Sequence, residues 1–218
     1  MSEQVSRIIV PVDGSPTAAA AARHASLLAR LLDAPLQLLH VMPLNPAELC
    51  DIPANRQAEA DHDRAVRLEI AEEAFAKARA AIEPDLTPAP EEVVLEDSTF
   101  IRHPDRAIVA HARSQPACLL VLGARHLSEV GKFVQGSVSN EVVHRARCPV
   151  TIVHDDASMQ EASGIGRVLL PVDGSRHANQ AAGLAGDLAR SAEVPVELVF
   201  CQPGGQVGGL EEDEESQA

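Results

Sequence analysis

Two short segments of this chain carry residues whose types and spacing suit the binding of a small anion. The first is the turn 11–15, PVDGS, which follows a continuous apolar run at residues 7–12. The second is the segment 123–139, which ends in GSVS where a helix is predicted to start. Free backbone N–H groups and hydroxyls at a helix start are suited to holding phosphate. The two segments together predict a cleft for a small anionic molecule.

The elements that must position these segments alternate between strand and helix. Short apolar runs predict strands at 7–12, 36–41, 92–96, 118–123 and 150–154. Helical spacing and caps predict helices at 16–32, about 55–82, 104–114 and about 137–145. This order predicts an α/β fold with a doubly wound parallel sheet, in which ligands bind outside the carboxyl ends of the strands where the strand order reverses. If strands 7–12 and 118–123 are neighbours, both segments face one crevice.

Composition agrees with such a sheet. The chain has four phenylalanines and no tryptophan or tyrosine, so its core must be built from Val, Ile, Leu and Ala. Alanines are expected to let helix 16–32 lie close to the sheet. Its predicted inner face consists of Ala18, Ala21, Ala22, Ala25, Leu28, Ala29 and Leu32. The predicted inner face of helix 55–82 consists of Val66, Ile70, Ala74, Ala78 and Ile82.

The opening of the chain occurs twice. Residues 7–43 align without a gap with residues 167–203, and both copies contain PVDGS. We therefore expect a complete domain at 1–155, a linker at 156–166, a truncated β-α-β copy at 167–203 and a disordered acidic tail at 204–218. The second copy lacks a counterpart of residues 123–139, so we expect that it cannot enclose a ligand by itself.

Charge and cysteine usage limit the function classes. The net charge of −14 disfavours nucleic acid and anionic lipid as partners. We expect a cytoplasmic protein, because no segment reads as a signal peptide or a membrane span. The four cysteines are scattered, with no CxxC, so we interpret them as small apolar residues and expect no zinc or redox site. Asp61, His62 and Asp63 diverge around a helix axis, so we expect no metal site there either.

Several motifs carry a resemblance. PVDGS after the first strand, LHV in the second and the closing pattern GSVSxxVxxxxxCPVxxV resemble the universal stress protein family across residues 7–154. The resemblance implies a flavodoxin-like, Rossmann-like fold with strand order 3-2-1-4-5. It further implies an adenine-nucleotide site for ATP or AMP, with or without Mg²⁺, a homodimer formed through the last strand, and a role in stress survival.

The same resemblance implies which residues form the nucleotide site. In ATP-binding members a Gly-x2-Gly-x9-Gly-Ser/Thr loop holds the phosphates. Adenine and ribose lie against residues matching Pro11, Val12, Asp13 and Val41. The phosphate segment comprises Gly123, Arg125, His126, Gly136, Ser137, Val138 and Ser139.

The second glycine of that loop is His126 in this chain, which leaves two outcomes open. A side chain here opposes the close backbone approach that glycine permits, so the imidazole fills the phosphate pocket. Alternatively, His126 donates to phosphate together with Arg125 and Lys132 and replaces the lost backbone contact.

Two functions follow from the sequence. The first is a nucleotide-binding stress regulator with no catalytic residue and at most slow ATP hydrolysis, because the GxSxG elbow of acyl-transfer enzymes is missing. His24, His111 and His144 are expected to be packed or exposed rather than catalytic. The second is a nucleotide-free stress protein whose second copy docks on the first domain or on another chain, either a second copy of itself or an unknown protein partner. A third interpretation is that the copy is a loosely held remnant.

Overall fold

The computed structural model describes residues 4–42, 57–96, 103–124, 138–154 and 164–200. Its main sheet is five-stranded and parallel, in the order β3-β2-β1-β4-β5. The strands are β1 (Arg7–Pro11), β2 (Leu36–Val41), β3 (Glu91–Leu95), β4 (Cys118–Ala124) and β5 (Val150–His154). The predicted α/β fold and the strand order 3-2-1-4-5 are confirmed.

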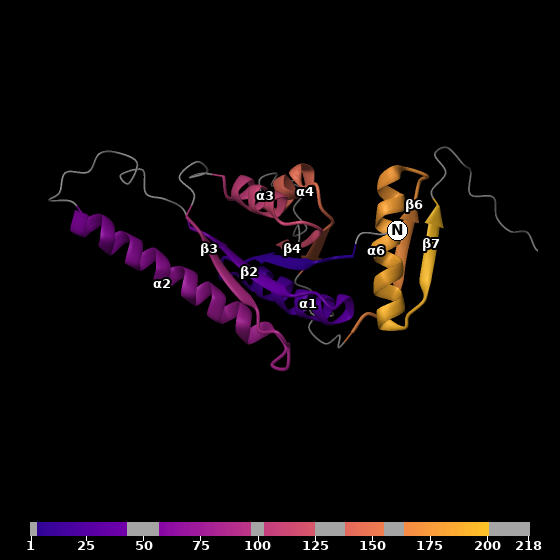
Figure 1. Ribbon diagram of the computed structural model, residues 1–218, viewed down its shortest axis with the longest axis horizontal. Coiled ribbons are helices and arrows are strands. Elements are labelled where there is room, and N and C mark those ends of the chain that lie inside the picture. The colour runs from indigo at the N-terminus through magenta and orange to yellow at the C-terminus, as the bar shows by residue number, and fades with distance from the viewer. Residues whose placement is uncertain (1–3, 43–56, 97–102, 125–137, 155–163, 201–218) are drawn as a thin grey trace, which may run out of the picture.

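Helices cover both faces of this sheet (Figure 1). On one face lie α1 (Pro16–Leu32) and α2 (Gln57–Ala81), and on the other lie α3 (Pro104–Ser114) and α4 (Val138–Arg145). Alternate strand residues therefore enter two separate apolar clusters. Ile8 and Val10 pack toward α1, whereas Ile9 packs toward α3 and α4. Such two-sided burial is why these strands read as continuous apolar runs in the sequence.

Local sequence explains where α1 begins and ends. The Ser15 hydroxyl accepts a hydrogen bond from the Ala18 N–H at 3.2 Å, and Pro16 occupies the first helical position. The helix ends at Asp33, which adopts the left-handed conformation with φ of 50°. The predicted inner alanines are buried, and Ala20 and Ser26 are buried as well. The buried face of α1 is wider than a sheet-facing stripe because the helix also contacts two further helices, α2 and α6.

The structure corrects the prediction for the first half of α2. Ala74 and Ala78 are buried as expected, but Val66 and Ile70 are 41% and 52% exposed. Figure 1 shows the reason, because the beginning of α2 extends beyond the sheet. Arg64 in this half reaches Glu96, just after β3, and donates to both of its carboxylate oxygens at 3.0 and 2.6 Å. Helical periodicity thus indicated the right face for only the second half of the helix.

A second β-α-β unit follows the main sheet. It consists of β6 (Val168–Val172), α6 (Arg176–Ala192) and β7 (Val196–Phe200), and β6 and β7 form a separate two-stranded parallel sheet. Figure 1 shows α6 between the main sheet and this small sheet. Leu184 and Leu188 of α6 pack against the core cluster that α1 also enters. Among the helices in the described ranges, none combines the length and apolarity that crossing a bilayer requires.

Candidate functional site

The site predicted from the sequence lies at the carboxyl edge of the main sheet. β1 and β4 are hydrogen-bonded neighbours, with Ile8 beside Leu119. From β1 the chain proceeds outward through β2 to β3, and β4 and β5 then fill the opposite side. The strand order therefore reverses between β1 and β4, which is where open α/β sheets bind ligands. Turn 11–15 leaves β1 at this point.

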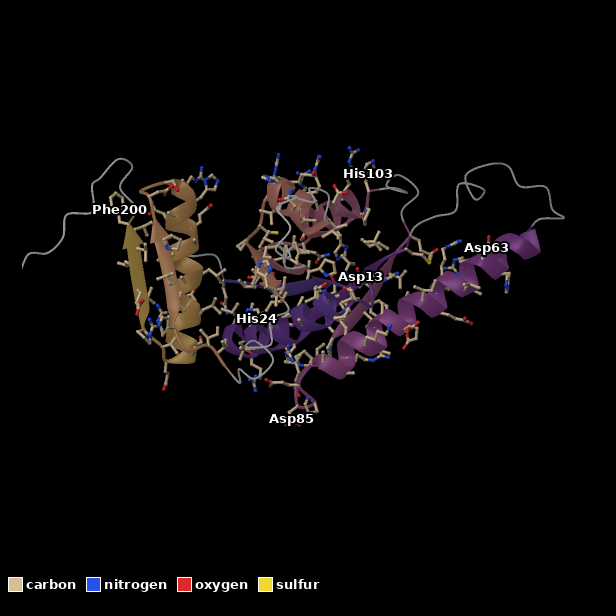
Figure 2. The ribbon with its side chains drawn as sticks, turned by 180° about the vertical axis from the view of Figure 1, so that it is seen from behind. Asp13, His24, Asp63, Asp85, His103 and Phe200 are labelled. Carbon is tan, nitrogen blue, oxygen red and sulfur yellow. The ribbon has the colours of Figure 1, made fainter. Side chains whose placement is uncertain are left out.

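Side-chain contacts fix the shape of turn 11–15. The Ser15 N–H donates to Asp13 Oδ1 at 3.0 Å, and Gly14 between them has φ of +78°. This backbone conformation favours glycine, because a Cβ would be strained there. The Asp13 side chain is exposed, and Figure 2 shows it over the middle of the molecule. The turn therefore holds one carboxylate in a defined position at the start of α1.

His40 supports the same turn from below. Its side chain is 6% exposed, and its Nδ1–H donates to the Val12 carbonyl oxygen at 2.8 Å. The Val12 N–H in turn donates to the Leu39 carbonyl oxygen at 2.8 Å. The His40 ring also meets the edge of the Phe75 ring, with centroids 6.2 Å apart. The motif LHV did not by itself predict a role for His40. The sequence signal for its supporting role is a histidine inside an otherwise apolar strand.

Gly123 has a packing role in addition to its predicted ligand role. A Cβ placed on it would lie 2.2 Å from the Thr17 carbonyl oxygen. The first turn of α1 therefore lies directly against the end of β4, and only a glycine permits that approach. This contact joins the start of α1 to the strand from which the predicted phosphate segment departs.

The remaining predicted residues are only partly described. Val41 is half-buried and packs toward α3 and α4, whereas Val12 is buried on the α1 side, so these two lie on opposite faces of the same edge. Pro11 ends β1 beside Leu39. At the start of α4, Val138 is 37% exposed and Ser139 is buried. Arg125, His126, Gly136 and Ser137 lie outside the described residues.

The opposite, amino edge of the sheet carries a polar network. The Gln37 side chain is 2% exposed and donates from Nε2 to Glu91 Oε2 at 3.0 Å. Its Oε1 accepts from His111 Nε2 at 2.7 Å, and Arg7 forms an ion pair with Glu91. Burial lowers the pKa of His111, and the nearby Arg7 lowers it further. His111 is half-buried within this network, which ties β1, β2, β3 and α3 together.

Two of the cysteines, interpreted from the sequence as small apolar residues, lie in one apolar region at this amino edge. Cys118 is 2% exposed within the cluster beneath α3 and α4, and Cys148 packs against the same cluster.

Comparisons with known proteins agree with this architecture. The model of the Universal stress protein family matches residues 4–154. A universal stress protein of Mycobacterium tuberculosis is 29% identical over 194 residues, covering 86% of this chain and 60% of the relative. The chain thus spans about 60% of the length of that relative. A universal stress protein of Thermus aquaticus is 34% identical over 149 residues, covering 67% of this chain and 96% of the relative.

A solved structure supports the fold alone. A universal stress protein from Archaeoglobus fulgidus has a TM-score of 0.57 at 20% identity, covering 93% of this chain and 70% of that one. The parallel sheet, the turn after β1 and a family match across the whole main sheet lead to one conclusion: this chain belongs to the universal stress protein family.

Proposed function

We propose that this chain is a cytoplasmic stress-response regulator that binds ATP or AMP at the carboxyl edge of the main sheet, between β1 and β4, with little or no turnover. The observation that carries this proposal is the adjacency of the two strand ends. β1 and β4 are hydrogen-bonded neighbours at the point where the strand order reverses. A single ligand can therefore contact both turn 11–15 and the segment that follows β4.

The chemistry of turn 11–15 suits a nucleoside. Asp13 uses Oδ1 to accept the Ser15 N–H, and its exposed carboxylate has capacity for further hydrogen bonds from ribose hydroxyls. His40 fixes the Val12 carbonyl, which holds the backbone of the turn in one orientation. In the proposal, Pro11, Val12 and Val41 supply the apolar and backbone contacts to adenine.

Phosphate binding is assigned to the segment after β4. We place the phosphates against Gly123, Gly136 and Ser137, and against the start of α4 at Val138 and Ser139, where a helix N-terminus favours an anion. Arg125 and His126 are the cationic candidates of this segment. Mg²⁺ accompanies ATP in the proposal, bound mainly through the phosphates.

The test is direct measurement of ligand in the purified protein. Mass spectrometry of the ligand released from freshly purified protein should detect an adenine nucleotide, and calorimetry with ATP, with and without Mg²⁺, should give saturable heat. No released nucleotide and no heat at millimolar ATP would reject the proposal. His126→Gly separates the two outcomes for His126: a gain of binding in the variant means that the imidazole fills the pocket, and a loss means that it donates to phosphate.

A second candidate function is assembly, and a specific observation favours it. Leu198 and Phe200, on one face of the small sheet, are 70% and 65% exposed, and Leu169, on the other face, is 59% exposed. Leu198 pairs with the buried Leu170, so Leu198 and Phe200 lie on the same face of the small sheet as Leu170 but remain uncovered on β7. Exposed apolar patches of this kind mark interaction surfaces, and within the described residues each of β6 and β7 has one unpaired edge. The occupant we propose is a second copy of this chain, because identical edges can pair about a two-fold axis.

Light scattering after size-exclusion chromatography tests the assembly. Leu198→Arg should convert the proposed dimer to a monomer, because a charge would be buried in the interface. Ile70→Arg is the matched control, since Ile70 is also an exposed apolar residue but lies on α2. A dimer that survives Leu198→Arg would place the interface elsewhere, for example at the β5 edge that the family resemblance implies.

A further inference from the structure

Cys118 and Cys148 lie side by side at the amino edge of the main sheet, away from the proposed nucleotide site. Cys118 begins β4, and Cys148 lies two residues before β5. Leu120 is paired with Val150, and the Leu120 N–H donates to the Pro149 carbonyl oxygen at 3.0 Å. Both cysteines are two residues before that pair, Cys118 at the start of β4 and Cys148 in the bend that leads into β5.

The two side chains share one face of the sheet. Cys118 belongs to the apolar cluster beneath α3 and α4, and Cys148 packs against the same cluster. Neighbouring parallel strands are about 4.8 Å apart. Disulfides form across Cα separations of about 4.4 to 6.8 Å when the Cβ atoms point together. The register of β4 and β5 and the shared apolar cluster therefore bring the two cysteines into the same neighbourhood.

The two thiols lie near enough for each to shift the pKa of the other. The Cys118 thiol reaches the Ala112 carbonyl oxygen at 3.4 Å. Cys118 is 2% exposed, whereas Cys148 is half-buried, so the pair is reached from solvent through Cys148.

The proximity of the two thiols favours one thiolate in the pair. The Cys148 thiol lowers the pKa of Cys118 to about 7, whereas Cys118 and burial raise the pKa of Cys148. Because the two groups titrate together, the first proton belongs to the pair rather than to one sulfur. Thiolate is the form that reacts with oxidants, so a lowered thiol pKa favours reaction at this pair.

We propose that Cys118 and Cys148 form a peroxide-sensitive thiol pair that closes reversibly into a disulfide between β4 and β5. One sulfur attacks an oxygen of hydrogen peroxide, the O–O bond breaks, and a sulfenic acid and one water form. The neighbouring sulfur then attacks the sulfenic sulfur, the S–O bond breaks, and a second water leaves with the remaining thiol proton. Two thiols and one peroxide thus give one disulfide and two waters, and a dithiol such as dithiothreitol reverses the change by exchange.

The experiment uses the full chain with Cys50 and Cys201 replaced by serine, so that Cys118 and Cys148 are the only thiols. After stoichiometric hydrogen peroxide, intact-mass spectrometry should show a loss of two hydrogens and both thiols should resist alkylation. Proteolysis should yield one peptide pair linked through Cys118 and Cys148. Dithiothreitol should restore the original mass and both thiols. Peptide mapping of the unsubstituted chain provides the same readout if the serine replacements impair folding.

The matched controls are Cys118→Ser and Cys148→Ser in the same background. Each should retain one thiol that gives a sulfenic acid trapped by dimedone, because no neighbouring sulfur is present to displace the oxygen. In denaturant the reduced chain should form the linked peptide more slowly, since folding holds the sulfurs together. Oxygen added to either cysteine without a link, links only between chains, or thiols that survive excess peroxide would each overturn the proposal.

Discussion

The two β-α-β units of this chain have the same turn but different surroundings. Turn 171–175 repeats the geometry of turn 11–15: the Ser175 N–H donates to Asp173 Oδ1 at 2.8 Å, and Gly174 has φ of +78°. Burial differs sharply at the strand that follows, where Leu38 of β2 is 0% exposed and the corresponding Leu198 of β7 is 70% exposed. Local sequence therefore determines the turn and its cap, whereas α2 and β3 next to β2 determine burial.

The difference extends to the proposed site. Beyond turn 11–15 lies β4, and Gly123 meets the Thr17 backbone there. The β6 strand pairs only with β7 among the described residues, so turn 171–175 has no counterpart of the β4 end beside it. His40, which supports Val12, corresponds to Phe200, which is 65% exposed. The two turns thus have the same internal geometry but different neighbouring residues. The second turn can therefore serve as a control for ligand binding at the first.

The largest expected contrast is in core truncation. Leu38→Ala should lower the free energy of unfolding by about 2 to 5 kcal/mol, because it leaves a cavity in a buried cluster. In the monomeric chain, Leu198→Ala should change it by no more than about 0.5 kcal/mol, because the side chain is mainly exposed there. Urea unfolding measures both. Equal losses would mean that the small sheet is covered in solution, as the proposed assembly requires, and repeating the measurement at several protein concentrations would identify that cause.

A smaller contrast is expected at the helix caps. Ser15→Ala removes the hydroxyl that accepts the Ala18 N–H and should cost about 1 kcal/mol of global stability. Ser175→Ala removes the equivalent contact to Ala178, at 3.1 Å, from a unit attached mainly through α6. Its effect should appear as faster hydrogen exchange confined to α6, with little change in the global transition. A global loss as large as that of Ser15→Ala would show that both units unfold together.

The smallest effect is a pH dependence at the position where α1 has His24 and α6 has Leu184. Burial lowers the pKa of His24, so the folded state favours the neutral ring. As the pH falls below about 6.5, the unfolded chain takes up a proton on this histidine before the folded chain does. The contribution of the neutral His24 to the free energy of unfolding is therefore complete above this pH and decreases on acidification. His24→Leu should reduce the loss of Tm between about pH 7 and about pH 5.5.

His144→Leu serves as the control for this effect, because His144 is exposed on α4. The control should retain the pH dependence of the parent chain, to which His111 also contributes in the same direction. An identical pH profile for His24→Leu and the parent would contradict the assignment to His24.

Sequence reasoning predicted the fold well because its signals are local and periodic. The strands read as apolar runs, Ser15 and Pro16 marked the start of α1, and a strand order of 3-2-1-4-5 was implied by the family resemblance. Turn 11–15 was predicted at the carboxyl edge for the same reason, since it directly follows a strand.

Features that depend on contacts between distant segments were missed. The outward position of Val66 and Ile70 depends on where the sheet ends, which helical spacing does not encode. The placement of Cys118 near Cys148 depends on the register of β4 against β5. The role of His40 depends on the Val12 carbonyl lying above it, and the packing role of Gly123 depends on how closely α1 approaches β4. Each of these features depends on a segment that is remote in the sequence, so local periodicity and short motifs do not predict it.

The central claim is that a nucleotide binds at turn 11–15 because β4 ends beside it. Calorimetric titration of ATP with Mg²⁺ into the parent chain, Asp13→Ala and Asp173→Ala tests this most directly, since both variants lose the same turn contact. We expect Asp13→Ala to weaken binding by about tenfold or more, as removal of a charge-assisted hydrogen bond does, and Asp173→Ala to leave the affinity unchanged. Equal affinities for all three proteins, or a loss in Asp173→Ala alone, would contradict the account.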